Sequence, residues 1–553
     1  MNSSTLALYV KDLENLIKGD VSIKDKDLEK VARDTSLFYV KPIIVIYPKN
    51  GDDISAVIRY INEINKKGAN FNITMRSAGT CMTGGPLSQS IVMDTSKYMN
   101  HITHVTKEYA TAESGVYYRD FEKETLKKGW LMPSYPASRE LAAIGGIVSN
   151  NSGGEKTLVY GKTENYVKSL DVVFSDGSCD TIHKLSRVEL DKKMSEDTTS
   201  GRIHKEMYEL INKNYNLIMK AKPTVSKNSS GYYLWNVYDK EKDTFDLNKL
   251  IVGSQGTLAC VSSVTITGVK PKNHSRMMVM FLPTTSRLGE IIPALLKHKP
   301  ETMESYDDNV FKIAIRFFGD IARRMGGSMF TLGFQFLPEF WMAISGGIPK
   351  IILMAEFTGD SEEEVKKQVD EAYEDMKRFD LPMKKMRDEL EAKKYWTFRR
   401  ESFSLLRNHL HGLRTAPTID DIIVHPKDLP EFLPKLEKIF SKYTDLIYTV
   451  QGHMGDANFH IIPLVNIHKE GIVNTIHKVM DEVYDLVLFY KGSISAEHND
   501  GLLRTPYLQK MFDSEIIYLF EKTKSIFDPQ GLLNPMKKVH GDKDFAWNHI
   551  DMK

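Results

Sequence analysis

The sequence predicts an α+β protein built from two or three packed units. Its 553 residues exceed what a single hydrophobic core usually contains, and 41% of them are hydrophobic, which is enough to fill several cores. Short apolar runs alternate with charged segments whose apolar residues recur at helical spacing. Glycine-rich loops connect several of these runs, and the sequence shows no internal repeat or low-complexity tract.

The composition argues against several classes of protein. The 74 basic and 73 acidic residues leave a net charge of +1, so no overall electrostatic attraction draws the chain to nucleic acid or to an anionic membrane. The three cysteines, Cys81, Cys179 and Cys260, lie far apart and form no C-x-x-C motif. We therefore expect neither a disulfide framework nor an Fe–S or zinc-ribbon module, and we expect a cytoplasmic protein.

We also expect no transmembrane segment. No stretch approaches the ~20 apolar residues that a membrane helix needs, and the N-terminus has no basic region followed by a long apolar run. The nearest exception, residues 340–355, is interrupted by two glycines, a proline and a lysine. We interpret it as a loop entering a buried strand, with peripheral contact with a membrane as the alternative.

The first domain is predicted at 38–270, with helices from residues 1–37 laid over it. Its beginning is a β-α-β unit, in which strands 43–47 and 71–75 flank a helix capped by Asp53. Further strands are predicted at 90–94, 169–174 and 261–267, with a turn at Asp176-Gly177 between the last two.

The charged interval 191–201 predicts a solvated surface loop within that domain. Residues 271–480 predict a second α+β domain, with strands at 277–281 and 351–355 and a helix at 361–379. The final run, Phe527–Pro535, contains too little apolar sequence to fold alone, so we expect it to pack back on the first domain. We expect the C-terminal segment 481–553 as a whole to complete the active site and to return to the first domain.

A cluster of metal-type ligands lies near the end of the second domain. The run Gln451-Gly-His-Met-Gly-Asp-Ala-Asn-Phe-His460 is followed by Glu497-His498, so His453, His460 and Glu497 can supply three ligands to a metal. His498 would remain free for proton transfer. The two histidines of the run differ by an odd number of positions, so we expect a bend at Gly455-Asp456. We expect Asp456 and Asn458 to orient the ligands, and Asp500 to be solvated.

Three glycine-rich loops indicate close approach of the backbone to a long ligand. They lie at 76–85, 145–154 and 253–258, and the first follows a predicted strand, where successive backbone N–H groups can hold a pyrophosphate. Neither G-x-G-x-x-G nor G-x-x-x-x-G-K-[ST] is present, so nicotinamide binding of the Rossmann type and P-loop nucleotide hydrolysis are unsupported.

The ordered motifs resemble one family. They are R-S-A-G-T-x-x-T-G-G from Arg76, Pro136-Ala-Ser138, Ile144-Gly-Gly146, Asn150-x-x-Gly-Gly154, Tyr160-Gly161, Gly253-Ser-x-Gly-Thr-Leu258, H-x-G-D-x-N-x-H, Glu497-His498 and F-D-P-x-G-x-L-N-P. From about residue 40 to 540 this chain resembles the FAD-linked oxidases of the vanillyl-alcohol oxidase and p-cresol methylhydroxylase superfamily. Within that superfamily it is most similar to the D-lactate, glycolate and D-2-hydroxyglutarate dehydrogenase branch.

The resemblance implies a two-subdomain FAD-binding domain of the p-cresol methylhydroxylase type and an α+β cap domain of the FAD-linked oxidase C-terminal type. It implies FAD that is not covalently bound, because Thr80 stands where covalent relatives commonly have histidine. The implied cofactor-binding residues are Arg76, Ser77, Ala78, Gly79, Thr80, Thr83, Gly84, Gly85, Pro136, Ser138, Gly145, Gly146, Asn150, Gly153, Gly154, Tyr160, Gly161, Gly253, Gly256, Thr257, Leu258 and Asn534.

The resemblance also implies a reaction. A D-2-hydroxy acid is oxidised to the 2-oxo acid by hydride transfer to flavin N5, with a divalent metal (zinc, manganese or iron) on His453, His460 and Glu497. His498, as a neutral imidazole with a pKa of about 6.5, is the expected base. Arg399 stands where the family places its substrate arginine, with Arg400 and Arg414 as rivals.

Two positions depart from the family's patterns. Ile462 replaces the asparagine of the 2-hydroxyglutarate enzymes, which favours lactate or another small apolar hydroxy acid. Asn499-Asp500 replaces the glycine-containing E-H-G-x-G form and leaves the local geometry open. The alternatives are a flavin-dependent transferase of the alkyldihydroxyacetonephosphate synthase type and a flavin electron-transfer subunit. The electron acceptor is open among a quinone, an electron-transferring flavoprotein, an Fe–S subunit and dioxygen.

Overall fold

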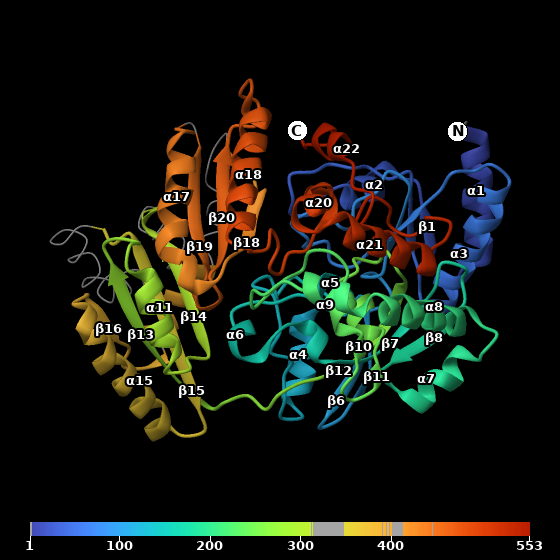
Figure 1. Cartoon of the computed structure of the whole chain (residues 1–553). Coiled ribbons are helices and arrows are strands. Elements are labelled where there is room, and N and C mark those ends of the chain that lie inside the picture. Colours follow the sequence, from blue (N-terminus) through green and yellow to red (C-terminus); the bar gives the residue numbers. More distant parts are fainter. Residues whose placement is uncertain are drawn as a thin grey trace.

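The computed structural model describes residues 3–310, 312, 348–389, 391–393, 395–397, 399–400, 413–444 and 446–552. Figure 1 shows two lobes, with both chain ends in the same lobe. Residues 340–347, part of the stretch for which membrane contact was the alternative, lie outside the described residues. Within the described part of the chain, no helix is long and apolar enough to cross a membrane.

The first lobe begins with a four-stranded sheet in the order β1 (Asp20–Ser22), β2 (Ile44–Tyr47), β4 (Ile91–Asp94) and β3 (Ile73–Arg76). Strands β2 and β3 both run parallel to β4, and α3 (Gly51–Lys66) connects β2 to β3, as the sequence predicted. The helices α1 (Ser3–Leu16) and α2 (Asp25–Val31) precede and contact this unit, and strand β1 between them was not predicted.

Asn50, rather than Asp53, caps α3. The side chain of Asn50 accepts a hydrogen bond from the backbone N–H of Asp53, whereas the carboxylate of Asp53 accepts from the backbone of Lys18, Gly19 and Lys49. Asp53 lies three residues after the cap, where a carboxylate can reach back to N–H groups that precede the helix. The predicted helix is therefore confirmed, and the predicted cap is wrong.

A second, five-stranded sheet completes this lobe, in the order β5 (Ile102–Val105), β6 (Tyr109–Glu113), β12 (Cys260–Thr267), β7 (Val167–Val173) and β8 (Cys179–His183). The remaining elements up to residue 251 are α4 (Tyr118–Leu126), α5 (Ile144–Asn150), α6 (Thr157–Tyr160), β9 (Leu185–Ser186), α7 (Arg187–Met194), α8 (Thr199–Lys213), α9 (Tyr215–Ala221), β10 (Tyr238–Asp239), β11 (Thr244–Phe245) and α10 (Asn248–Ile251).

The interval 191–201 is not a simple loop. It contains the end of α7 and the start of α8, and a short turn separates the two helices. Ser186 and Glu189 form a reciprocal capping box on α7, and Thr198 caps α8. Only Leu190 is buried in α7, so the helix lacks the apolar stripe from which the sequence could have predicted it.

The second lobe is built on one large sheet. Its order is β16 (Met383–Lys385), β13 (His274–Leu282), β15 (Ile351–Gly359), β14 (Thr302–Asp307), β19 (Ile447–His453), β20 (Asn458–Val465) and β17 (Arg414–Thr415), and β18 (Ile419–Ile423) also pairs with β20. Its helices include α11 (Leu288–Leu296), α15 (Glu362–Met376), α17 (Leu429–Ser441) and α18 (Ile472–Phe489). The predicted strands 277–281 and 351–355 lie within β13 and β15.

The C-terminal segment crosses back to the first lobe (Figure 1). It contains α19 (Gly501–Arg504), α20 (Leu508–Met511), α21 (Ser514–Phe527) and α22 (Lys543–Asn548). Beyond α21, the backbone of Leu533 bridges to Ile73 of β3. The side-chain amide of Asn534 donates to the carbonyls of Gly85 (3.0 Å) and Gln255 (2.7 Å), so this segment ties two glycine loops together.

Candidate active site

A cavity of about 850 Å³ extends from the glycine loops of the first lobe to the histidines of the second. The first lobe lines it with the loop after β3 and with the residues around α5. The second lobe lines it with side chains of β18, β19 and β20, and Glu497 and His498 lie at the same end. Its volume falls in the range of cofactor and small-molecule sites.

Most of the predicted cofactor-binding residues line this cavity. They are Arg76, Ser77, Ala78, Gly79, Thr80, Gly85, Pro136, Ser138, Gly145, Gly146, Asn150, Gly153 and Gly256. Gly79 has a φ of +71°, and a Cβ at this position would lie 2.0 Å from the guanidinium of Arg76. The positive φ and the nearby guanidinium both favour glycine at this position of the loop after β3.

The other predicted cofactor residues do not line the described cavity. Two of them form hydrogen bonds elsewhere: Gly84 donates its backbone N–H to Asp34 (3.0 Å), and the Tyr160 hydroxyl donates to Glu301 (2.9 Å). The full set is Thr83, Gly84, Gly154, Tyr160, Gly161, Gly253, Thr257, Leu258 and Asn534. A sequence motif thus identifies a whole loop. The structure shows which residues of that loop line the cavity and which do not.

Two features of the wall suit a large polar cofactor. Ser114 lines the cavity with a buried hydroxyl oxygen that has no hydrogen-bond partner among the residues that the structure describes. Such an oxygen is costly unless a ligand or water satisfies it. At Gly146, an added Cβ would meet only the Cβ of Ser77, at 3.9 Å, so the backbone here borders open space. Ser114 belongs to no recognisable motif, so the sequence alone does not indicate it.

The two histidines of the H-x-G-D-x-N-x-H run lie on neighbouring strands. His453 ends β19, a short 3-10 turn at Met454–Asp456 reverses the chain, and Ala457 follows at a φ of +53°. His453 is opposite Asn458, and His460 is opposite Gln451, so the two histidines share one face of the hairpin. Their ring centroids lie 5.1 Å apart. The expected bend is a complete reversal of the chain.

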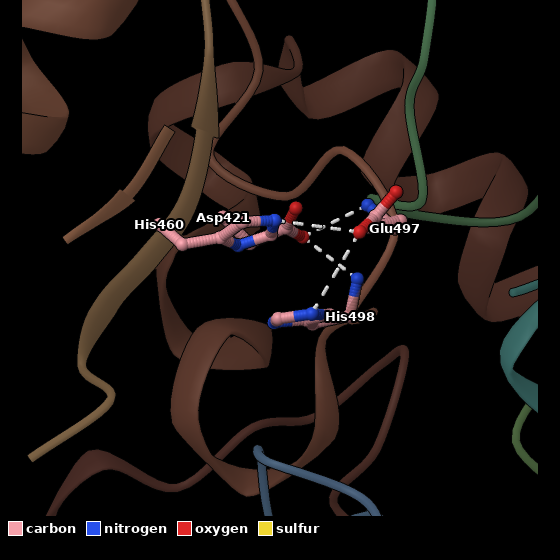
Figure 2. Close-up of side chains that lie close together, drawn as sticks. All are labelled: Asp421, His460, Glu497 and His498. Atoms are coloured by element: carbon pink, nitrogen blue, oxygen red, sulfur yellow. Dashed lines mark hydrogen bonds and ion pairs between the residues drawn. The ribbon is translucent and has the colours of Figure 1, made fainter. Parts of the chain in front are cut away.

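Three imidazoles converge on one oxygen of Glu497. Oε1 of Glu497 lies 3.0 Å from Nε2 of His453, 3.5 Å from Nε2 of His460 and 3.9 Å from Nε2 of His498. Figure 2 shows His460 and His498 beside Glu497 and Asp421, and the ligand atoms of these four residues lie within 4.8 Å of one another. The residues predicted as metal ligands and base are thus brought together.

The other ring nitrogen of each histidine faces a buried carboxylate. Nδ1 of His453 lies 2.6 Å from Glu304, Nδ1 of His460 lies 2.9 Å from Asp420, and Nδ1 of His498 lies 3.0 Å from the second oxygen of Asp420. Metal-bound histidines typically have such a partner, which fixes the tautomer and leaves Nε2 for the metal. Neither acid belongs to a motif that the sequence shows; the one local sign of Asp420 is the pair Asp420-Asp421 within the apolar strand β18.

Asp421 positions the backbone of the Glu497-His498 pair. One oxygen of its carboxylate accepts hydrogen bonds from the backbone N–H groups of Glu497 (2.8 Å) and His498 (2.7 Å) and from the hydroxyl of Ser495. The other oxygen accepts from Asn458 (3.2 Å), as expected for an orienting role of Asn458. Because both oxygens are occupied, Asp421 is better suited to holding the ligand loop than to binding a cation.

The protonation of the cluster differs from the expected neutral imidazole. Burial lowers the pKa of His498. The negative charges of Asp420, Asp421 and Glu497 have a larger, opposite effect, so the pKa rises from its ordinary 6.5 to about 9. His453 reaches a pKa of about 9 in the same way, chiefly because Glu304 outweighs its burial. Burial raises the pKa of Glu497, yet Lys227 and His453 hold it well below its ordinary value. A divalent cation among these groups would favour their neutral imidazole forms.

The three candidate arginines have different surroundings. Arg399 lines the cavity and is 8% exposed, and its guanidinium donates to Glu304 (3.2 Å) and to Gln451 (2.8 Å). Arg400 also lines the cavity and pairs with Glu155 (2.6 Å). Arg414 does not line the described cavity and pairs with Asp551. Only the first two can reach a ligand in the cavity.

Asn499 and Asp500 both have structural roles. Asn499 has a φ of +70°, a conformation that glycine and asparagine tolerate best, so asparagine preserves the backbone that a glycine would adopt. Its side-chain amide donates to the carbonyls of Asn150 (3.1 Å) and Gly253 (2.9 Å). Asp500 is fully buried and pairs with Lys538 at 2.9 Å, so the expectation of a solvated Asp500 is wrong.

Comparison with known proteins adds a family context. Residues 42–182 match the FAD binding domain, and residues 271–538 match the C-terminal domain of FAD linked oxidases. D-2-hydroxyglutarate dehydrogenase of Haemophilus influenzae is 23% identical over 550 residues, which cover 96% of this chain and 51% of that protein. D-lactate dehydrogenase of Archaeoglobus fulgidus is 24% identical over 502 residues, which cover 90% of this chain and 91% of that protein.

The fold is also similar to solved structures. The structure of p-cresol methylhydroxylase with substrate bound matches with a TM-score of 0.68 at 12% identity and covers 97% of each chain. This likeness confirms the predicted type of fold. The chain spans about half the length of the first curated relatives that it matches.

Proposed function

Since this chain belongs to the FAD-linked oxidases, we propose that it is an FAD-dependent dehydrogenase that oxidises a D-2-hydroxy acid to the corresponding 2-oxo acid. The observation that carries the proposal is the convergence of three histidine Nε2 atoms on Glu497 Oε1, at one end of a cavity whose other end is lined by glycine loops. Matched relatives named as D-2-hydroxyglutarate and D-lactate dehydrogenases support the same class of substrate.

The glycine loops and Ser114 would hold FAD without a covalent bond. Residues 76–82 and Gly85 line the cavity, and so does Ser114, whose buried hydroxyl has no hydrogen-bond partner among the described residues. When bound, FAD supplies the two-electron acceptor for the hydride that leaves the α-carbon of the substrate. The side-chain amides of Asn150 and Asn499 fasten the loops at this end of the cavity, because they donate hydrogen bonds to the backbone carbonyls of Glu497 (3.5 Å) and Asn150 (3.1 Å), respectively.

His453, His460 and Glu497 would hold a divalent metal. Two imidazoles and one carboxylate suit zinc, manganese or iron and leave coordination positions open for the hydroxyl and carboxylate oxygens of the substrate. When bound, the metal supplies a positive charge beside the substrate oxygen that loses its proton. Glu304 and Asp420 orient the two histidines through Nδ1, so that each Nε2 faces Glu497.

His498 would accept the hydroxyl proton of the substrate. Its Nδ1 faces Asp420 and its Nε2 faces Glu497, so Nε2 is the nitrogen that borders the ligand space. Arg399 would bind the carboxylate of the substrate, because its guanidinium lines the same end of the cavity. Ile462, on the face of β20 that carries His460, adds an apolar wall and favours a lactate-like substrate over one with a second carboxylate.

The test is an anaerobic titration of the FAD-loaded protein. D- and L-lactate, glycolate, D-2-hydroxyglutarate and longer 2-hydroxy acids are added in turn while the visible flavin band is recorded, before and after removal of metal by a chelator. We expect one D-acid to bleach the band only in the metal-loaded protein. A bound flavin that none of these acids bleaches would contradict the proposal.

A further inference from the structure

A buried lysine lies on the far side of Glu497 from the histidines. Lys227 comes from the segment between α9 and α10, and its side chain is 1% exposed. Its ammonium lies 3.1 Å from Oε2 of Glu497 and 3.4 Å from Oδ2 of Asp456. A buried charge is retained only where opposite charges compensate for its loss of hydration, and here two carboxylates do so.

The two oxygens of Glu497 therefore have different surroundings. Oε1 faces the three imidazoles, whereas Oε2 faces Lys227 and the backbone of Gly153, where an added Cβ would lie 3.0 Å away. Asp456, the acid of the H-x-G-D run, pairs with Lys227 and accepts a hydrogen bond from the hydroxyl of Ser226 (2.7 Å). Both acids are thus engaged on the side opposite the histidines.

Hydrogen bonds of the residues that follow Lys227 hold its segment beside Glu497. The N–H of Ser229 donates to the carbonyl of Ser495 (2.8 Å), and the hydroxyl of Ser229 donates to the carbonyl of Ala496 (3.2 Å). A second buried lysine, Lys162, donates to the carbonyls of Asn228 (2.7 Å) and Ala496 (3.1 Å). The segment that carries Lys227 is therefore fastened beside the ligand loop.

We propose that Lys227 is a positioning residue that occupies Oε2 of Glu497 and restrains Asp456, so that the metal centre receives only one carboxylate oxygen. The inference rests on the proposed function, in that it takes His453, His460 and Glu497 as metal ligands. A carboxylate can bind a cation through one oxygen or through both. Restricting Glu497 to one oxygen, and keeping Asp456 away, leaves more coordination positions for the two oxygens of a hydroxy acid.

The charge of Lys227 has a second consequence. A fixed positive charge near the site repels a divalent cation, and it stabilises the metal-free protein by separating the charges of Glu497 and Asp456. Replacing Lys227 by a neutral side chain should therefore tighten metal binding, while the metal-free protein becomes less stable. A lysine with a purely structural role would give the opposite result, because disordered ligands bind metal more weakly.

The experiment compares Lys227→Met with Lys162→Met, which also removes a buried lysine that contacts the segment carrying Lys227 but leaves Glu497 and Lys227 in place. Zinc affinity is measured by competition with a chromophoric chelator, and melting temperature is measured with and without zinc, all on FAD-loaded protein. We expect Lys227→Met to bind zinc about tenfold more tightly than wild type, or better. Its melting temperature should rise more on zinc addition than that of wild type or Lys162→Met.

Lys227→Gln separates the two parts of the inference and replaces Lys227→Met if that variant does not fold. Glutamine removes the charge but can still donate a hydrogen bond to Oε2 of Glu497. Lys227→Gln should therefore bind zinc more tightly than wild type, while X-ray absorption spectra show no additional oxygen ligand on the zinc. In Lys227→Met, Oε2 is released and the same spectra should show one additional oxygen ligand. Equal or weaker zinc binding by the Lys227 variants, with wild type binding zinc, overturns this inference alone. A wild-type protein that binds no divalent metal overturns both the inference and the proposed metal centre.

Discussion

The carboxylate of Asp420 lies 2.9 Å from Nδ1 of His460 through one oxygen, and its second oxygen lies 3.0 Å from Nδ1 of His498. The rings of His460 and His498 are stacked, with centroids 5.0 Å apart and an interplanar angle of 19°. A single acid thus hydrogen-bonds a candidate metal ligand and lies at ion-pair distance from the candidate base. Arg504, fully buried behind it, donates to the backbone carbonyl of Asp420 and holds this acid in place.

Replacing Asp420 by asparagine should impair both functions at once. Asparagine keeps the shape of the side chain but cannot offer a negatively charged oxygen to both imidazoles, so we expect ~10–100-fold losses in metal affinity and in the rate of flavin reduction. Metal competition and stopped-flow reduction by the substrate acid measure the two effects. A variant that loses neither would show that the histidines are oriented without this acid.

His498→Ala should separate binding from chemistry. His498 contributes no predicted metal ligand, so the variant should retain FAD and metal, whereas flavin reduction should slow by ~10²–10⁴-fold because the proton acceptor is missing. Flavin content, metal content and the anaerobic reduction rate are measured on the same sample. Reduction at the wild-type rate would remove His498 from the role of base.

Arg399→Gln should weaken substrate binding, with Arg414→Gln as the matched control. The loss of a charged hydrogen-bond donor to a carboxylate should raise KM for the hydroxy acid by ~10–100-fold. Arg414 pairs with Asp551 and does not line the described cavity, so its variant should keep the wild-type KM. Steady-state kinetics measure both variants; a normal KM for Arg399→Gln would transfer the role to Arg400.

Gly146→Ala should lower FAD affinity without destabilising the protein. Gly146 lies within α5, where alanine is the better helix former, and its Cβ would enter the open space of the cavity. Gly51→Ala, at the start of α3 and in ordinary contact with Ser262 at 3.6 Å, is the matched control. FAD affinity is measured by titrating the two apoprotein variants with FAD, and their melting temperatures are compared with that of the wild type. Equal FAD affinities would place the cofactor away from α5.

Glu356 should make stability depend on pH. Burial raises its pKa from an ordinary 4.5 to about 7, so the folded protein binds this proton more tightly than the unfolded chain between these two values. The stability of the wild type therefore falls as the pH rises from 4.5 to 7 through this group. Glutamine can still accept from the indole N–H of Trp396 and removes the effect.

The expected result is that Glu356→Gln gains melting temperature relative to wild type at pH 8 and shows little or no gain at pH 4.5. Glu363→Gln, in the exposed first turn of α15, serves as the control and should show no such difference between the two pH values. The melting temperatures of the wild type and both variants are measured by thermal unfolding at pH 4.5 and at pH 8. A gain for Glu356→Gln that is the same at both pH values would mean that its ionisation does not destabilise the fold.

The sequence predicted those features that depend on residues close together in the chain. Apolar runs located some of the strands in each lobe, and the motif residues His453, His460, Glu497 and His498 lie together in the structure. Local rules failed where a residue has partners outside its own segment. Asp500 seemed a surface acid, but Lys538 compensates for its burial, and that pairing depends on how the C-terminal segment crosses the first lobe.

The acids that orient the histidines could not be predicted for the same reason. Glu304 precedes His453 by 149 positions, and Asp420 precedes His460 by 40. Their proximity depends on strand order: β14 lies beside β19, and β18 lies beside β20. A short motif records which ligands a site uses, whereas the groups that orient those ligands are determined by the register of the whole sheet.

The contact between β3 and the segment after α21 also constrains how the protein is made. Thr74 bonds to Asn534 across 460 positions of sequence, and Ile73 takes part in a bridge to Leu533. During synthesis, this edge of β3 stays unpaired until residues 533 and 534 have left the ribosome. We therefore expect the first lobe to remain incomplete until residue 534 has been synthesised, and we expect contacts of such long range to make its final closure slow.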